Sequence, residues 1–191
     1  AVGSASGTIN APHVELQAAA LPSGNINAVL DLPLDDLGAA LATVAFTEFD
    51  LTPVNGLLPP SSIGLSGTAS GNLIANGFES FPRIEGDVIP HGVTLTVPYL
   101  GTHYEVDGNV EVRPDGFLMD QWTLFDASGA EARFNGTVLH QNFKDWNLDF
   151  GIEISARAIT LINIPITDDA LFYGTASGTG DINVSGFGPM L

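Results

Sequence analysis

Hydrophobic and polar residues alternate along much of the second half of the chain. In the segment WNLDFGIEISA, residues 146–156, one alternate set is apolar and the other is polar or glycine. A period of two over such a length is typical of a β-strand with one buried and one solvated face. The same alternation appears in residues 93–97, 104–113, 130–140 and 179–187.

Turn sequences separate these runs. They are RPDG at 113–116, DASG at 126–129 and NFKD at 142–145. Asp, Asn, Gly and Pro favour turns because they adopt or stabilise the backbone angles that turns require. The pattern therefore predicts consecutive antiparallel strands with one wet face and one dry face.

Helical signals are few. Residues 34–44, LDDLGAALATV, have acidic residues near their start and several alanines, but Gly38 interrupts them, so a short helix and a strand both fit. LLPPSS at 57–62 predicts a loop or linker. We expect an all-β fold with at most one short helix: an N-terminal sheet repeat over residues 1–62 and one continuous sheet over 63–191.

The chain repeats the phrase Gly-x-Ala-Ser-Gly three times. The copies are residues 3–7, 67–71 and 174–178, and each leads into a strand-like run. Glycine inside a strand pattern usually marks a bend, a bulge or a close backbone approach. We expect each copy to bend the sheet; the alternative is that small residues merely fill an edge.

Charge excludes several classes of partner. The chain carries 5 Lys and Arg against 22 Asp and Glu, a net charge of −17. The chain lacks the basic residues that bind a nucleic-acid backbone or an anionic lipid headgroup, so we expect no nucleic-acid partner. The absence of cysteine excludes disulfides and thiolate chemistry.

No catalytic constellation stands out. In each repeat the middle residue is alanine rather than the serine of a nucleophile elbow, and Ser6, Ser70 and Ser177 come one place late. The acidic pairs Asp35–Asp36 and Asp168–Asp169 are expected to be solvated turns or caps. We therefore expect neither an enzyme nor a bound cofactor.

The four histidines lack the spacing of a metal site. None stands in a His-x-His or His-Glu-x-x-His arrangement, so we predict no zinc. We expect all four to be surface or turn residues: His13, His91, His103 and His140.

The dry face is the informative feature, because it needs cover. A second sheet supplies it in a sandwich, whereas a single curled sheet leaves an apolar groove. Between residues 117 and 125 the inward set is ambiguous, since Leu118, Trp122 and Leu124 compete with Phe117, Met119 and Phe125. The predicted contact residues on this face are Val93, Leu95, Val97, Tyr104, Val106, Val110, Val112, Phe134, Val138, Leu148, Phe150, Ile152, Ile154, Ile182 and Val184.

The region from about Phe81 to Gly186 resembles the C-terminal domain of the TamB family of AsmA-like envelope proteins. The resemblance rests on phrases in order: IEGDV, VPYLGTHYEVDGNVEV, LFDASGAEARFNGTVLH, NFKDWNLDFGIEISA and LINIPITDDALFYGTASGTGDINVSGF. The stretch LSGTASGNLIANGFESFPRIEG is similar to the family's repeated unit. The first 60 residues resemble it only through SGTINAPHVEL.

The resemblance implies a long antiparallel sheet curled into an open, taco-like trough with a hydrophobic lumen. It implies a periplasmic protein, anchored in the inner membrane by a helix outside this chain, that serves outer-membrane biogenesis. It also implies an outer-membrane barrel partner of the TamA type, reached through a C-terminal part that this chain lacks. We accordingly expect this chain to be part of a longer protein.

The family's role suggests two cargoes. One is phospholipid, whose acyl chains the trough holds during transport between the membranes. The other is the strands of outer-membrane barrel proteins or autotransporters, which the same trough chaperones during protein translocation and assembly. A closed β-sandwich with a structural or adhesive role is the third interpretation.

Overall fold

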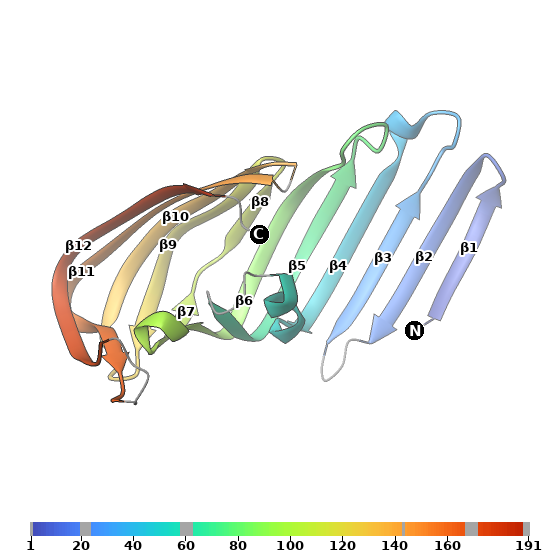
Figure 1. Cartoon of the computed structure of the whole chain (residues 1–191). Coiled ribbons are helices and arrows are strands. Elements are labelled where there is room, and N and C mark those ends of the chain that lie inside the picture. Colours follow the sequence, from blue (N-terminus) through green and yellow to red (C-terminus); the bar gives the residue numbers. More distant parts are fainter. Residues whose placement is uncertain (1, 20–23, 58–62, 143, 167–171, 189–191) are drawn as a thin grey trace.

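One antiparallel sheet contains all twelve strands of the described residues (Figure 1). The computed structural model describes residues 2–19, 24–57, 63–142, 144–166 and 172–188. The expected all-β fold is confirmed, and the helices of the described part are three short 3-10 helices: η1 (Leu37–Ala39), η2 (Thr52–Leu57) and η3 (Pro98–Leu100).

The sheet follows the order of the chain. Neighbouring strands pair in the order β1-β2-β3-β4-β5-β6-β7-β9-β10-β11-β12, and β8 also lies between β6 and β9. The strands are β1 (Val2–Thr8), β2 (Ala11–Ala19), β3 (Asn25–Asp31), β4 (Leu41–Asp50), β5 (Gly64–Asn76), β6 (Arg83–Val97), β7 (Thr102–Asp107), β8 (Val110–Arg113), β9 (Gly116–Asp126), β10 (Glu131–Gln141), β11 (Lys144–Ile164) and β12 (Gly174–Gly188).

Two segments that the sequence suggested as single elements are each divided between two elements in the structure. The alternating run 104–113 is divided into β7 and β8 at Gly108, whose φ of 151° breaks the strand. A Cβ at Gly108 would collide with the Trp122 ring, so glycine at this position leaves room for that side chain. Residues 34–44 are shared between η1, which Asp36 caps by accepting a hydrogen bond from the Gly38 amide, and β4.

The alternation along each strand builds one apolar face across the whole sheet. Residues directly opposite each other on antiparallel strands point to the same side. Two rows of paired residues define the apolar face. One row crosses the sheet from β1 to β12, and the other crosses it from β2 to β12. The first is Gly3, Leu16, Ala28, Val44, Leu73, Gly86, Val112, Phe117, Val138, Leu148 and Gly186; the second is Ala18, Ile26, Phe46, Gly71, Val88, Val110, Met119, Gly136, Phe150 and Val184.

The opposite face is mostly polar. The adjacent row of paired residues on that side contains three carboxylates and five amide or hydroxyl groups beside three apolar residues. Its members are Val2, Gln17, Asn27, Ala45, Asn72, Asp87, Glu111, Leu118, Thr137, Asp149 and Ser185. The predicted wet and dry faces therefore exist, and the separation is cleaner on the dry side.

A β-bulge resolves the ambiguous strand, β9. Gln121 has a φ of 54°, and its amide donates to Asn135 Oδ1 at 2.7 Å. The register shifts by one residue at this point, so Met119 lies opposite Gly136 whereas Trp122 lies opposite Phe134. Both competing sets thus contribute to the apolar face: Phe117 and Met119 before the bulge, Trp122 and Leu124 after it.

The repeated phrase is associated with bulges at two of its three copies. In β5, Gly71 pairs with Phe46 but Ala69 pairs with Phe49, so β4 has an extra residue opposite Ser70. In β12, the register with β11 shifts next to Ser177. The β1 copy pairs with β2 without a shift. Bulges therefore lie beside the second and third copies, in the neighbouring strands β4 and β11, and that the repeat itself bends the sheet stays a prediction.

The sheet curls strongly toward its C-terminal end, while β1 to β5 stay more open (Figure 1). Register is lost between Ile154 and Ile159 of β11, and beyond this point the strand reaches back toward β7 and η3. We call residues 159–164 of β11 with residues 174–178 of β12 the flap. The flap and the sheet enclose a hydrophobic core made of Val93, Tyr104, Val106, Leu124, Ala132, Ile154 and Ile159.

Candidate functional site: an apolar face

The predicted contact residues lie on one face of the sheet but differ in how far they are buried. Val93, Tyr104, Val106, Val112 and Ile154 are buried. Val184 is the most open at 50% exposure. The remaining residues are half-buried: Leu95, Val97, Val110, Phe134, Val138, Leu148, Phe150, Ile152 and Ile182. Their role in binding a cargo stays a prediction, and the buried ones contact protein in this structure.

The flap covers one part of the apolar face. Ile159 is buried in the core, and Leu161 packs against it. The Tyr104 hydroxyl donates to the Thr160 carbonyl oxygen at 2.6 Å, which ties the flap to β7. Tyr99 of η3 and Phe172 meet edge to face with ring centroids 5.6 Å apart. These contacts hold the flap against β7 and the core at this end of the strands.

A carboxylate inside the fold fastens the flap. Asp126 is only 7% exposed and ends β9. One carboxylate oxygen, Oδ2, accepts hydrogen bonds from the Thr160 amide and hydroxyl, both at 2.9 Å. The other, Oδ1, accepts from the Ser128 amide and hydroxyl and from the Ala130 amide.

These hydrogen bonds decide the protonation state of Asp126. Burial alone would raise the pKa of its carboxyl group, but the bonds from Ser128, Thr160 and Ala130 outweigh burial and hold the pKa well below its usual range. The carboxylate is therefore charged at neutral pH and fully engaged in local structure. Sequence reasoning assigned Asp126 to a turn and missed its second role, since its partner Thr160 is 34 residues away.

Aromatic side chains line the half-buried part of the apolar face. Trp122, Phe134 and Phe150 form a chain of rings with successive centroids 6.1 Å and 5.4 Å apart. Gly136 lies in β10, two residues after Phe134 and opposite Phe150, and a Cβ there would collide with the Phe150 ring and lie 3.0 Å from Phe134 Cζ. Glycine at this position lets the rings lie against the backbone, as aromatic residues do over glycines in strongly curved sheets.

His140 corrects one prediction. His140 is 8% exposed rather than a surface or turn residue, because its ring lies between those of Phe117 and Trp146. The distances between ring centroids are 5.8 Å to Phe117 and 5.1 Å to Trp146. Burial lowers the pKa of the imidazole, and nearby Asp115 acts in the opposite direction. His140 follows Val138 in the set of β10 residues that faces the apolar side. The alternation of residues 130–140 already placed it in that set.

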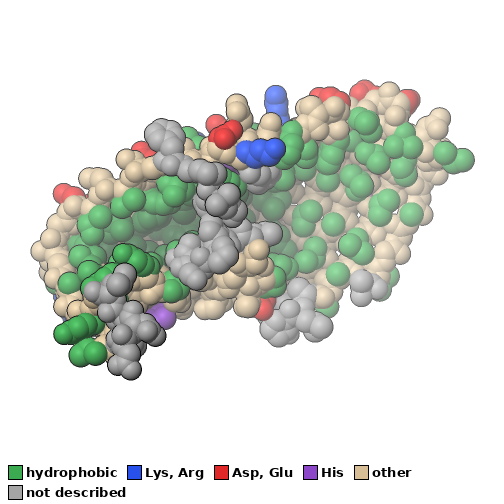
Figure 2. Space-filling view, in the orientation of Figure 1, with side chains coloured by type: hydrophobic (Ala, Val, Ile, Leu, Met, Phe, Trp, Pro, Cys, Tyr) green, Lys and Arg blue, Asp and Glu red, His purple; other side chains and the backbone are tan. Residues whose placement is uncertain are grey.

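Strands β1 to β4 leave their apolar side accessible. Val14 and Leu16 of β2 are 39% and 42% exposed although both belong to the apolar side of the sheet. Figure 2 shows hydrophobic side chains spread over this part of the molecule and lining the hollow of the curled part. Within the described residues no second layer packs on this region, and Thr43, Thr47 and the asparagines of β3 alternate to the other side.

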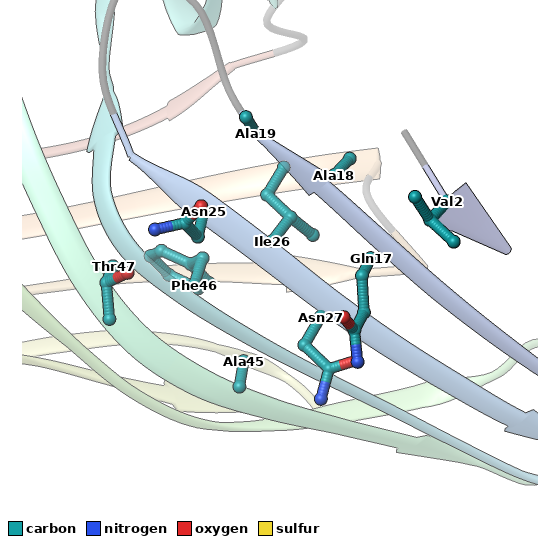
Figure 3. Close-up of a pocket in the computed structure, with 10 residues that line it drawn as sticks. All are labelled: Val2, Gln17, Ala18, Ala19, Asn25, Ile26, Asn27, Ala45, Phe46 and Thr47. Carbon is teal, nitrogen blue, oxygen red and sulfur yellow. The ribbon is translucent and has the colours of Figure 1, made fainter.

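The described residues do not support metal binding or a pocket with ionisable groups. No group of three or more His, Cys, Asp or Glu side chains there is placed to hold a metal ion. The predicted cap role of Asp36 is confirmed by its bond to Gly38, while Asp168–Asp169 lies outside the described residues. A hollow of about 520 Å³ at the N-terminal strands contains no ionisable side chain among its ten lining residues, which come largely from the polar side (Figure 3).

Comparisons with known proteins give no relative. No family model, curated protein or solved structure matches this chain. The structure adds one negative observation about membranes: no helix in the described part is both long and apolar enough to cross a bilayer. The function must therefore be argued from the apolar face itself.

Proposed function

We propose that this chain holds lipid acyl chains against its apolar face. The observation that supports this most strongly is the pair of uninterrupted apolar rows that cross the sheet from β1 or β2 to β12. An apolar surface of this extent on one side of a sheet normally requires a partner layer or a ligand. The described residues supply such a layer only at the flap.

The chemistry of the two rows favours hydrocarbon over any other ligand. Neither row contains an ionisable side chain, and no described metal cluster exists to orient a polar substrate. The carboxylates of the adjacent row point to the other side of the sheet, and the net charge is −17. A lipid would accordingly place its acyl chains on the sheet and leave its headgroup in solvent.

The magnitude of the hydrophobic effect makes this role physically reasonable. Removing one CH₂ group from water is worth about 0.8 kcal/mol, so a 16-carbon tail in water costs on the order of 12 kcal/mol. An apolar face that covers one side of the tail offsets a large part of that cost. It does so without binding more tightly than a bilayer, which is the condition for a cargo that must also leave.

The resemblance to the TamB family extends the proposal to a cellular role. We place the protein in the periplasm, anchored to the inner membrane by a part outside this chain, with phospholipid transport to the outer membrane as its task. An open trough along the sheet is the corresponding shape, and a TamA-type barrel is the corresponding partner. These statements rest on the quoted phrases of the sequence, and the apolar face is compatible with them.

The competing function is the chaperoning of barrel strands or autotransporters. It rests on the same apolar face, which would hold the apolar side chains of a client strand. A sheet edge offers backbone hydrogen bonds to a client strand, whereas a lipid uses none. An experiment that detects acyl chains on the face, rather than polypeptide at the edges, separates the two functions.

Quenching of tryptophan fluorescence by brominated lipid tests the proposal. Bromine quenches indoles only at close contact, and the chain has two tryptophans, Trp122 and Trp146. We expect acyl-brominated phospholipid to quench Trp146 in the Trp122→Phe variant, and unbrominated lipid to leave its emission intensity nearly unchanged. Trp122, which packs against the core and donates to the Asn109 carbonyl oxygen, should be quenched less in Trp146→Phe.

The proposal is wrong if folded protein shows no quenching of either tryptophan at lipid concentrations that saturate a fatty-acid-binding control protein. A circular dichroism spectrum of each variant establishes that the sheet is intact. Equal quenching in native and urea-unfolded protein also counts against it, because the apolar face exists only in the folded sheet.

A further inference from the structure

One buried side chain on the apolar side has no hydrogen-bond partner. Thr102 begins β7 and is 3% exposed, and its hydroxyl oxygen is the one buried side-chain polar atom without a partner among the described residues. Thr102 shares its side of β7 with Tyr104 and Val106, which both belong to the hydrophobic core. A buried hydroxyl without a hydrogen bond costs free energy, so native proteins seldom keep one unless a water or a ligand completes it.

The flap lies directly beside Thr102. A Cβ at the preceding residue, Gly101, would collide with the carbonyl oxygen of Asn163 in the flap. Among the described residues no strand pairing joins the flap to β7, so the flap is held by apolar packing and by the hydrogen bonds of Thr160. A segment held in this way can separate from β7 without breaking a backbone ladder.

Apolar side chains lead from Thr102 to the open part of the apolar face. Val106 lies four residues along the strand, roughly 13 Å away at about 3.3 Å per residue. Val106 pairs with Leu124 of β9, and Trp122 of the same strand begins the chain of rings that reaches Phe150. A hydroxyl at one end of a path lined by hydrocarbon matches an amphiphile with a polar group at one end of its chain.

The surroundings of Thr102 favour a neutral acceptor over a carboxylate. The buried polar residues of the described part are Thr102, Asp126 and His140. Asp126 is charged at neutral pH, whereas the lowered pKa of His140 favours the neutral imidazole, so neither supplies a positive charge. Asp126 also pairs with Tyr104, two residues from Thr102, and its charge opposes a second carboxylate there. An ester carbonyl oxygen accepts a hydrogen bond without bringing a charge into the core.

On the basis of the proposed acyl-chain function, we propose that Thr102 selects ester-linked lipids by donating a hydrogen bond to the ester carbonyl oxygen of an acyl chain that enters beneath the flap. The chain then follows the apolar side chains past Trp122 to the open face. The headgroup lies at the rim beside η3, where Tyr99 is 69% exposed. Ether-linked lipids bind more weakly, because they have no carbonyl oxygen to offer to Thr102.

Competition between ester-linked and ether-linked lipids tests this selection. The probe is phosphatidylcholine with brominated acyl chains, bound to the Trp146→Phe chain, in which Trp122 alone reports contact. Unbrominated ester-linked phosphatidylcholine should displace the probe at about three- to tenfold lower concentration than the ether-linked lipid of equal chain length, the difference made by one hydrogen bond. Thr102→Val keeps the shape of the side chain and should abolish the difference by weakening the ester-linked lipid. Thr96→Val, whose hydroxyl meets His103 on the polar side, should preserve it.

Equal competition by the two lipids, or a difference that persists in Thr102→Val, overturns the selection by Thr102. Trp146 in the Trp122→Phe chain separates this failure from failure of the acyl-chain function. If Trp146 is quenched by the brominated lipid but no ester preference exists, the chain holds acyl groups and Thr102 does not select them. If neither tryptophan is quenched, both proposals are wrong.

Stability without lipid shows whether the Thr102 hydroxyl is unpartnered in the free protein. Thr102→Val should raise the urea midpoint, because a methyl group replaces an unsatisfied hydroxyl. A lower midpoint would mean that a buried water already satisfies the hydroxyl, which contradicts the proposal.

The rate of probe binding tests entry beneath the flap. Thr160→Val removes one hydrogen bond between the flap and Asp126, so the open form should be more populated and the probe should bind about two- to tenfold faster. An unchanged rate in stopped-flow fluorescence of Trp122 would contradict this route of entry.

Discussion

The flap depends on Asp126, and replacing this residue should open it. In Asp126→Asn the amide retains one oxygen, which can keep the turn bonds to Ser128 and Ala130. The atom facing Thr160 becomes an NH₂ group, which cannot accept from the Thr160 amide and hydroxyl. The substitution therefore removes two charge-assisted hydrogen bonds between β9 and the flap while it leaves the shape of the side chain unchanged.

The expected loss of stability follows from those two bonds. Hydrogen bonds to a charged group contribute about 1.5–3 kcal/mol each, so the loss of two should cost the variant about 3–6 kcal/mol of unfolding free energy. A domain of ordinary stability has about 5–15 kcal/mol in total, and the variant should therefore unfold at a clearly lower urea concentration. Asp149→Asn on the exposed side of β11 is the control, with a change within about 0.5 kcal/mol.

Urea titration followed by tryptophan fluorescence measures both changes. A double-mutant cycle with Thr160→Val isolates the interaction between the two side chains, and we expect a coupling of about 1–3 kcal/mol. If Asp126→Asn costs no more than Asp149→Asn, or if the cycle gives no coupling, Asp126 does not hold the flap.

The pH dependence of this contribution has a definite sign. The pKa of Asp126 is lower in the folded than in the unfolded chain, so its contribution is complete above the ordinary Asp value of about 3.8. It is lost as the pH falls below that value and through the depressed folded pKa. Asp126→Asn should lack this part of the acid destabilisation, which urea titrations at pH 5 and pH 3 can measure.

Three further predictions concern the apolar face. Gly136→Ala should cost about 1–3 kcal/mol in urea unfolding because the new Cβ meets the Phe150 ring, while Gly186→Ala, with open space around it, should cost little. The lowered pKa of His140 means that stability should fall as the pH drops from 7.5 to 5.5, below the unfolded value near 6.5, and His140→Phe should remove that slope. Gln121→Gly should stabilise the chain by about 0.5–1 kcal/mol, since φ is positive there, and a loss of stability would contradict the bulge.

Alternation predicted the C-terminal strands well because one face is strongly apolar. In β11, Leu148, Phe150, Ile152 and Ile154 alternate with polar or small residues, and the structure places all four on the apolar side. The strands before residue 50 were not predicted individually. Val29 and Ala45 lie on the polar side there, which weakens the contrast on which pattern reasoning depends.

Features that depend on residues distant in the sequence could not be predicted from the alternation of hydrophobic and polar residues. The bulge at Gln121 relies on Asn135 in the next strand, and no local signal distinguishes it from a slip in alternation. The register with β12 is lost after Ile154, inside the run 146–156 that alternates without interruption, so Ala156 was assigned to the dry face but is exposed. The fastening of the flap by Asp126 likewise needs a partner 34 residues away.

Photo-crosslinking to lipid tests the central claim most directly. A photoreactive amino acid at Phe150 lies on the apolar face, and the same group at neighbouring Asp149 lies on the polar face of the same strand. The protein is expressed in a bacterial periplasm and irradiated, and covalent phospholipid is sought by mass spectrometry. We expect adducts at position 150 and none at 149. Folded protein without lipid at either position, or with equal amounts at both, would contradict the claim that the apolar face holds acyl chains.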